Sequence, residues 1–118
     1  MDDLYVIRDT TTGLAKIGRS QNVSARLAQL RTANPGDLKI VVHVTGCGWA
    51  EGLLQRLCWD DHVRNEWFEF GSPLAVFVGL VQMRKGAPMD DFDLLSDLSC
   101  VAMDARECRA ERSKTHVA

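Results

Sequence analysis

Two short runs of apolar and β-branched residues near the start of the chain constrain the fold more than any other feature. The runs are Leu4–Ile7 and Leu14–Gly18, and the turn-forming residues Thr10–Gly13 lie between them. Two such runs joined by a short loop that contains glycine are typical of a β-hairpin. The sequence therefore begins with two antiparallel strands and a four-residue loop.

The loop length also predicts the register of this hairpin. A loop of residues 10–13 places Gly18 opposite Tyr5 and Lys16 opposite Ile7. Because side chains alternate between the two faces of a strand, these four residues share one face. A phenol and an ammonium group are thus expected on the same side of the sheet.

The following segments alternate between helical and extended patterns. Val23, Leu27 and Leu30 recur at helical spacing behind two candidate N-caps, Ser20 and Asn22. Pro and Gly in the segment 33–36 end this helix. The other expected elements are a strand over Leu38–Val44, an amphipathic helix over 49–58 with Trp49 on its buried face, an extended segment over 66–70, and a helix capped by Ser72 that continues to Met83.

These elements predict an α/β fold: a small three-stranded antiparallel sheet flanked by helices, with one or more further helices at the C-terminal end. A chain of 118 residues fits one domain of this kind. We expect that domain over residues 1–85. Residues 86–118 form an acidic and then mixed-charge extension, which is expected to be helical or partly ordered.

The charge distribution is uneven. The net charge of −2 alone argues against a nucleic-acid partner, which needs a cationic face. Residues 10–36, however, contain no acid, whereas residues 86–104 contain five aspartates and no base. The first segment can meet phosphate and the second cannot. The four cations of the first segment are Lys16, Arg19, Arg26 and Arg31.

Membrane and metal-ribbon classes find no support in the sequence. The longest apolar run, Leu74–Val81, is far too short to span a bilayer, and the acidic start does not resemble a signal peptide, so a cytoplasmic protein is expected. The cysteines form no CxxC pair, so we interpret them as small buried hydrophobic residues. They are Cys47, Cys58, Cys100 and Cys108.

Two charged residues lie beside the apolar stripes of predicted helices. Arg26 flanks the stripe of the first helix, and Glu51 flanks that of the second. A desolvated charge is costly unless it is paired or binds an ion, so these residues are either partners in an ion pair or parts of a site. Together with Tyr5 and Lys16 they provide a proton acceptor, two cations and a metal-binding carboxylate, a set suited to phosphodiester hydrolysis.

The spacing of these residues resembles the GIY-YIG nuclease superfamily. The matching residues are Leu4-Tyr5-Val6, Lys16-Ile17-Gly18, Arg26 and Glu51, followed by Glu66-Trp67-Phe68. The run YVIRDTTTGLAKIGRSQNVSARLAQLRTANPGDL more narrowly resembles the phage-type DNA-binding branch, which is shared with the meiotically up-regulated gene family. The resemblance covers about residues 4–70.

The resemblance implies a catalytic site for a DNA endonuclease or nickase. In this family pattern Tyr5 is the general base, Arg26 holds the phosphate, and Glu51 binds one Mg²⁺ or Mn²⁺ ion. Lys16 stands where the second motif has tyrosine, and cations near Tyr5 are expected to lower its pKa. Gln55 stands where relatives often have histidine. Lys16, Arg19, Arg26 and Arg31 are the expected nucleic-acid contacts.

Two alternatives remain open from the sequence. The same fold can serve as a DNA-binding module without turnover. The chain can also be an interaction or regulatory protein in which the acidic segment, residues 90–104, covers the basic face as a phosphate mimic. Several residues also have purely structural interpretations: Tyr5 as a strand aromatic, Lys16 and Arg19 as a solvated strand end, Arg26 and Glu51 as an ion pair, His43 and His62 as satisfied strand or turn residues, and Asn65 as an ordinary loop residue.

Overall fold

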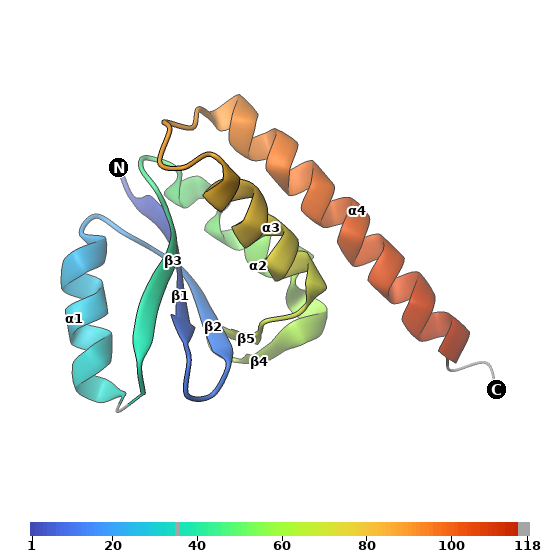
Figure 1. The fold of residues 1–118 in the computed structure, drawn as a ribbon, viewed down its shortest axis with the longest axis horizontal. Helices are drawn as coiled ribbons and strands as arrows, with labels where there is room; N and C mark the ends of the chain where they lie inside the picture. Colours follow the sequence, from blue (N-terminus) through green and yellow to red (C-terminus); the bar gives the residue numbers. More distant parts are fainter. Residues whose placement is uncertain (35, 116–118) are drawn as a thin grey trace.

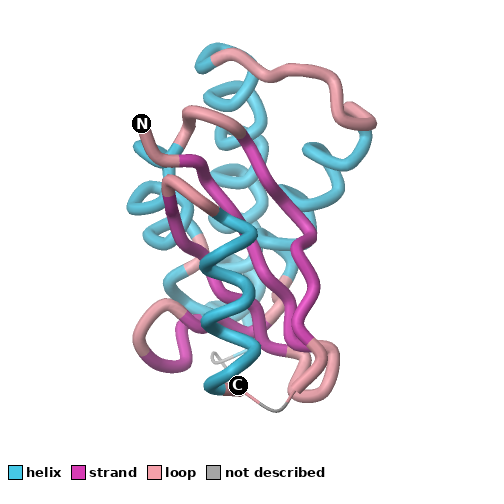
Figure 2. Tube along the Cα trace, turned by 90° about the vertical axis from the view of Figure 1, so that its left-hand side faces the viewer, coloured by secondary structure: helices cyan, strands magenta, loops and turns pink. Residues whose placement is uncertain are grey.

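The computed structural model describes residues 1–34 and 36–115 and shows one antiparallel sheet between two layers of helices (Figure 1). The strands lie in the order β3-β1-β2-β5-β4. Viewed from the opposite side of the sheet to α2–α4, helix α1 crosses in front of the strands (Figure 2). The elements are β1 Asp3–Asp9, β2 Leu14–Ser20, α1 Val23–Ala33, β3 Leu38–Val44, α2 Glu51–Leu57, β4 His62–Arg64, β5 Trp67–Glu69, α3 Ser72–Met83 and α4 Asp91–Thr115.

The predicted α/β class is confirmed, but the sheet has five strands where three were expected. The two additional strands, β4 and β5, are three residues long and follow one another through a turn at Asn65. β5 pairs with the first half of β2 only, from Leu14 to Lys16. The second half of β2 therefore has no strand beside it on that side.

The predicted hairpin and its register are confirmed. Tyr5 pairs with Gly18, and Ile7 pairs with Lys16. The loop is held by the Asp9 carboxylate, which accepts a hydrogen bond from the backbone N–H of Thr11 at 2.8 Å. Gly13 adopts φ +78°, a left-handed conformation that glycine takes without steric cost.

The central strand β1 is buried on both faces, which divides the core into two parts. Leu4 and Val6 pack with α2, α3 and α4 on one side. Tyr5 and Ile7 pack on the other side against the apolar stripe of α1. As predicted, that stripe is Val23, Leu27 and Leu30.

The predicted helix start at residues 20–22 is resolved in favour of Asn22. Its side-chain oxygen accepts the backbone N–H of Ala25 at 3.0 Å, which satisfies one of the free donors of the first turn. Ser20 accepts the N–H of Asn22 instead and so supports the cap from outside the helix. The helix ends at Ala33 with Asn34 as C-cap, while Pro35 lies outside the described residues.

Two local predictions in the second half of the chain are wrong. The segment predicted as a helix over 49–58 begins as a tight 3₁₀ turn, Gly48–Ala50, which leaves Trp49 44% exposed and not on the buried face. The N-cap of α3 is Gly71, not Ser72. Gly71 packs so closely on the Asp61 carboxylate that any larger residue would overlap it.

The C-terminal extension contains one long helix, α4, whose first half completes the core through Leu94, Leu98 and Val101. The structure places α4 against α3, on the face of the sheet opposite α1 (Figure 1). The acidic segment 90–104 therefore does not lie over α1, which carries Arg26 and Arg31, but Asp91 lines the same surface cavity as the basic residue Arg19. Cys47 and Cys58 are buried as expected, whereas Cys100 is exposed on the outer face of α4 and Cys108 is half-buried; all four are free thiols.

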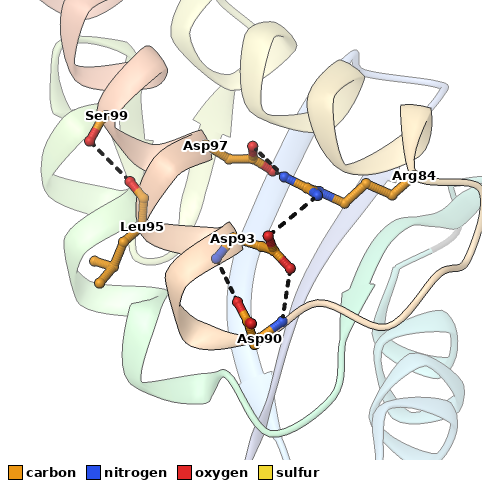
Figure 3. A network of polar contacts seen from close by, with 6 residues as sticks. All are labelled: Arg84, Asp90, Asp93, Leu95, Asp97 and Ser99. Carbon is orange, nitrogen blue, oxygen red and sulfur yellow. Dashed lines mark hydrogen bonds and ion pairs between the residues drawn. The ribbon is translucent and has the colours of Figure 1, made fainter.

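The acidic start of α4 is held by one arginine (Figure 3). Arg84 donates from Nη2 to Asp97 Oδ1 at 2.9 Å and from Nε to Asp97 Oδ2 at 3.3 Å. Its Nη1 lies 3.8 Å from the Asp93 carboxylate. Asp93 and Asp90 also exchange backbone-to-carboxylate hydrogen bonds, which caps the first turn.

Removing this arginine is expected to destabilise the fold because Asp97, only 5% exposed, would lose its cationic partner. We expect Arg84→Ala to lower the Tm by roughly 5–10 °C in thermal unfolding. Arg106→Ala, at an exposed position of α4, serves as control and should leave the Tm almost unchanged. Equal Tm values for the two variants would show that the pair with Asp97 does not stabilise the docked helix.

Every helix within the described ranges is too short or too polar to span a lipid bilayer.

Candidate functional site

The candidate site is built on the half of β2 that has no neighbouring strand. Helix α2 supplies hydrogen-bond partners there in place of a strand. Gln55 Nε2 donates to the carbonyl oxygen of Ile17 at 2.9 Å, and the Glu51 carboxylate, one helical turn earlier, accepts the backbone N–H of Arg19. Glu51 is thereby fixed at the edge of β2. Gln55 likewise has a structural partner at this edge.

Tyr5 lies on the neighbouring strand, β1, and pairs with Gly18 of β2. A Cβ atom at position 18 would overlap the Tyr5 ring and hydroxyl, so only glycine lets the phenol occupy this place. The Tyr5 side chain is 1% exposed and packs against α1. The first turn of that helix brings the Arg26 guanidinium to the Tyr5 hydroxyl, close enough to influence its ionisation.

The pKa of Tyr5 is raised above the ordinary value of a phenol. Burial is the main cause, since it penalises the phenolate. The hydrogen bond and the positive charge of Arg26 oppose this shift, while the carboxylates of Glu66 and Glu51 add to it. The expected lowering by a nearby cation is present at Arg26, but burial outweighs it, so the pKa of Tyr5 is raised overall.

Lys16 forms an ion pair with a carboxylate from the turn before β5. Its ammonium lies 2.9 Å from Glu66 Oε2 and 5.6 Å from the centre of the Trp67 ring. Lys16 is only 6% exposed, so its interpretation as a solvated strand end is wrong. A phosphate that approached Lys16 would compete with Glu66 for it.

The pKa of Glu51 is also raised. Burial is again the first cause, and repulsion from the Glu66 carboxylate is the second. Three interactions lower the pKa of Glu51 and so oppose the shift: the charges of Arg19 and Lys16, and the hydrogen bond from the backbone N–H of Arg19. Arg26 does not pair with Glu51; its Nη1 donates to Gln29 Oε1 at 3.2 Å. The interpretation of Arg26 and Glu51 as a structural ion pair is therefore wrong.

Glu66 is the site residue that the sequence analysis missed. It reaches the site because the turn before β5 returns the chain to β2, where Trp67 pairs with Lys16 and the Glu66 carbonyl accepts the Ile17 N–H at 3.1 Å. The segment over 66–70 was expected to be extended, but nothing in its apolar pattern indicates which strand it joins. Glu66 could have been found by predicting that this segment pairs with β2, which its residues do not indicate.

The structure thus brings together Tyr5, Lys16, Arg26 and Glu51, with Arg19 beside them. It does not bring Arg31 to this group. The Arg31 guanidinium donates to the carbonyl oxygen of Leu38 at 3.0 Å, at the far end of α1. Arg31 therefore joins α1 to β3 and lies away from the other predicted site residues.

The two histidines considered as ligands have structural partners, in agreement with their structural interpretation. His43 Nε2 lies 2.8 Å from Asp3 Oδ2. The His62 ring stacks on Trp59 at 4.0 Å between centroids and its Nε2 contacts the Asn65 carbonyl oxygen. Asn65 itself is exposed in a left-handed turn at φ +49°.

The donor set at the site fits a weakly held divalent ion. Among residues 1–34 and 36–115, no group of three or more His, Cys, Asp or Glu side chains is arranged to hold a metal. Mg²⁺, however, usually binds through one or two carboxylates and keeps several waters. The mutual repulsion of Glu51 and Glu66 is what a cation between them would relieve.

One surface cavity lies away from this group of residues, and a second borders it. The larger, about 410 Å³, lies between β3 and the end of α3 and contains none of the predicted site residues. The smaller, about 340 Å³, is lined in part by Arg19 and Trp49 and so borders the site.

The chain belongs to the T5orf172 domain family, whose model matches residues 4–81, more than half of its length. This domain occurs in proteins associated with phage and GIY-YIG-like nucleases. The match contains every element of the candidate site and ends within α3. No curated protein and no solved structure matches the chain.

Proposed function

We propose that this protein is a metal-dependent DNA endonuclease or nickase. Its catalytic residues for phosphodiester hydrolysis are Tyr5, Lys16, Arg26 and Glu51. The observation that carries the proposal is the position of Tyr5: a buried phenol, admitted by Gly18, with a guanidinium at its hydroxyl and the Glu51 carboxylate close enough to affect its ionisation. Membership of the T5orf172 family supports a nuclease or DNA-binding role.

Each side chain has a part in the proposed reaction. Arg26 binds the phosphate oxygens and stabilises the charge that develops on them. Tyr5 accepts the proton of the attacking water, and the arrival of the phosphate frees Lys16 from Glu66 so that it adds a second cation. A Mg²⁺ or Mn²⁺ ion held by Glu51, with Glu66 beside it, would stabilise the charge on the leaving oxygen.

A second candidate function is DNA binding without turnover. The raised pKa of Tyr5 and the neutralised Lys16 favour this reading, because both weaken proton abstraction in the free protein. A binding module would show affinity that falls with salt by about 0.9 log unit per log unit of salt for each phosphate neutralised. It would show this without nicking in any divalent ion.

The function is tested by nicking of supercoiled plasmid with Mg²⁺ or Mn²⁺, with chelator added as a control. We expect Arg26→Ala to lower the nicking rate by about 10²–10³-fold, the usual effect of losing one group that stabilises the transition state. Arg31→Ala, purified in the same way, should stay within about threefold of the unchanged protein, since Arg31 bonds to Leu38. Equal nicking by both variants would indicate a contaminant, and salt-dependent binding without nicking would support the second candidate.

A further inference from the structure

A second hollow borders the proposed catalytic site at its Glu51 end. It has a volume of about 340 Å³. Arg19 connects the two places, because its backbone N–H binds Glu51 while its side chain lines the hollow. We call this hollow the base cavity; it is lined by Met1, Asp2, Arg19, Gly46, Gly48, Trp49 and Asp91.

Trp49 offers an aromatic surface in the base cavity. It stands two residues before Glu51, in the 3₁₀ turn that leads into α2, and it is 44% exposed. Its Nε1 donates to Asp91 Oδ1 at 3.1 Å, which holds the indole in place. Within the part of the chain that the structure describes, no other ring stacks on Trp49. An ordered and exposed indole is a suitable platform for a planar ligand.

The polar groups around the base cavity select against phosphate and in favour of a nucleobase. Asp2 and Asp91 provide carboxylate oxygens, which repel a phosphate but accept hydrogen bonds from base N–H groups. The Arg19 guanidinium lies 3.7 Å from Asp2 and its side chain is 57% exposed, so it can stack on a base or pair with its acceptors. Arg26 and Lys16 then bind the phosphate, and the base cavity binds the base.

We propose that the base cavity binds an unpaired nucleobase of the nucleotide beside the scissile phosphate. This inference rests on the proposed nucleic-acid function and adds a substrate class to it: DNA that carries an unpaired nucleotide at the cut. Fully paired bases are stacked on both sides, and extruding one costs the stacking and pairing free energy. An unpaired base avoids that cost and gains the stacking on Trp49.

The test compares binding of two labelled DNAs of the same sequence in chelator, where no cutting occurs. One is a continuous duplex, and the other carries a single unpaired nucleotide in its centre. Stacking on an aromatic side chain is worth about 1–3 kcal/mol per base, so the protein should bind the second DNA about 5–150-fold more tightly. An abasic residue at the unpaired position should remove this preference.

Three variants make the test specific to Trp49. Trp49→Ala should bind both DNAs with the affinity that the unchanged protein has for the duplex. Trp49→Phe keeps an aromatic face and should retain part of the preference. Trp59→Ala is the matched control, because Trp59 is 53% exposed but stacks on His62 outside the base cavity. Thermal unfolding of each variant checks that the fold is retained.

The outcomes separate this inference from the proposed function. Nicking of plasmid without any preference for the unpaired nucleotide would overturn the base cavity alone. A preference that Trp49→Ala and Trp59→Ala reduce equally would also overturn it. A preference lost only in Trp49→Ala, in a protein that never nicks, would support the base cavity and contradict the nuclease. Absence of any DNA binding would overturn both.

Discussion

Replacement of Glu51 by alanine or glutamine is expected to lower divalent-dependent nicking by about 10²–10⁴-fold, because a metal contributes several kcal/mol to stabilising the transition state. Glutamine preserves the oxygen that accepts the Arg19 N–H but removes the charge that holds the ion. Plasmid nicking at fixed Mg²⁺ measures the effect. Glu69→Gln, an exposed change at the far end of β5, should nick at the unchanged rate.

The same Glu51→Gln variant should be more stable than the unchanged protein at neutral pH. The pKa of Glu51 is raised in the fold by burial and by Glu66, so folding favours the protonated form. That contribution to stability is present at acid pH and is lost as the pH rises through the raised pKa. The Tm of Glu51→Gln should therefore exceed that of the unchanged protein at pH 7, and the difference should shrink toward about pH 4. A Tm of Glu51→Gln below that of the unchanged protein at pH 7 would contradict this prediction.

Replacement of Tyr5 by phenylalanine is expected to lower the nicking rate by about 10²–10⁴-fold, the usual contribution of a general base. Phenylalanine fills the same place above Gly18 and keeps the packing against α1, so stability should change little. Nicking rates and thermal unfolding of the two proteins measure these effects side by side.

The pH dependence of nicking gives a second readout for Tyr5. Because burial raises the pKa of this phenol above its ordinary value, the active phenolate remains a minor species at neutral pH. The rate of the unchanged protein should rise by up to about tenfold per pH unit and show no plateau below about pH 9. Tyr5→Phe should lose this slope. A plateau near pH 7 in the unchanged protein would contradict the role of Tyr5 as base, and so would a Tyr5→Phe variant that keeps the slope.

Local signals were enough to predict the parts of the fold that lie close together in the sequence. The register of β1 and β2 follows from a short loop and from side chains that alternate between the two faces, and both are visible in residues 4–18. Helix α1 follows from its apolar spacing and from the cap at Asn22. These two elements alone position Tyr5, Lys16 and Arg26.

The missed parts depend on contacts between distant segments. β4 contains no buried residue, so no apolar alternation marks it, and its partner β5 is positioned by pairing with β2. That pairing brings in Glu66, which neutralises Lys16 and raises the pKa of Glu51. Trp49 was misplaced because its spacing fits a continuous helix, whereas the chain forms a 3₁₀ turn there. The degree to which Tyr5 is buried also depends on α1 and on Gly18, and it decided the direction of the pKa shift.

The most direct test of the proposed site is a crystal structure of the protein with Mn²⁺ and an oligonucleotide that carries a phosphorothioate linkage resistant to cutting. The expected result is one phosphate contacted by Arg26 and Lys16, with the Tyr5 hydroxyl facing its phosphorus atom. Anomalous scattering should then place a manganese ion on the Glu51 carboxylate. A phosphate bound elsewhere on the protein, or a manganese ion away from Glu51, would contradict the account.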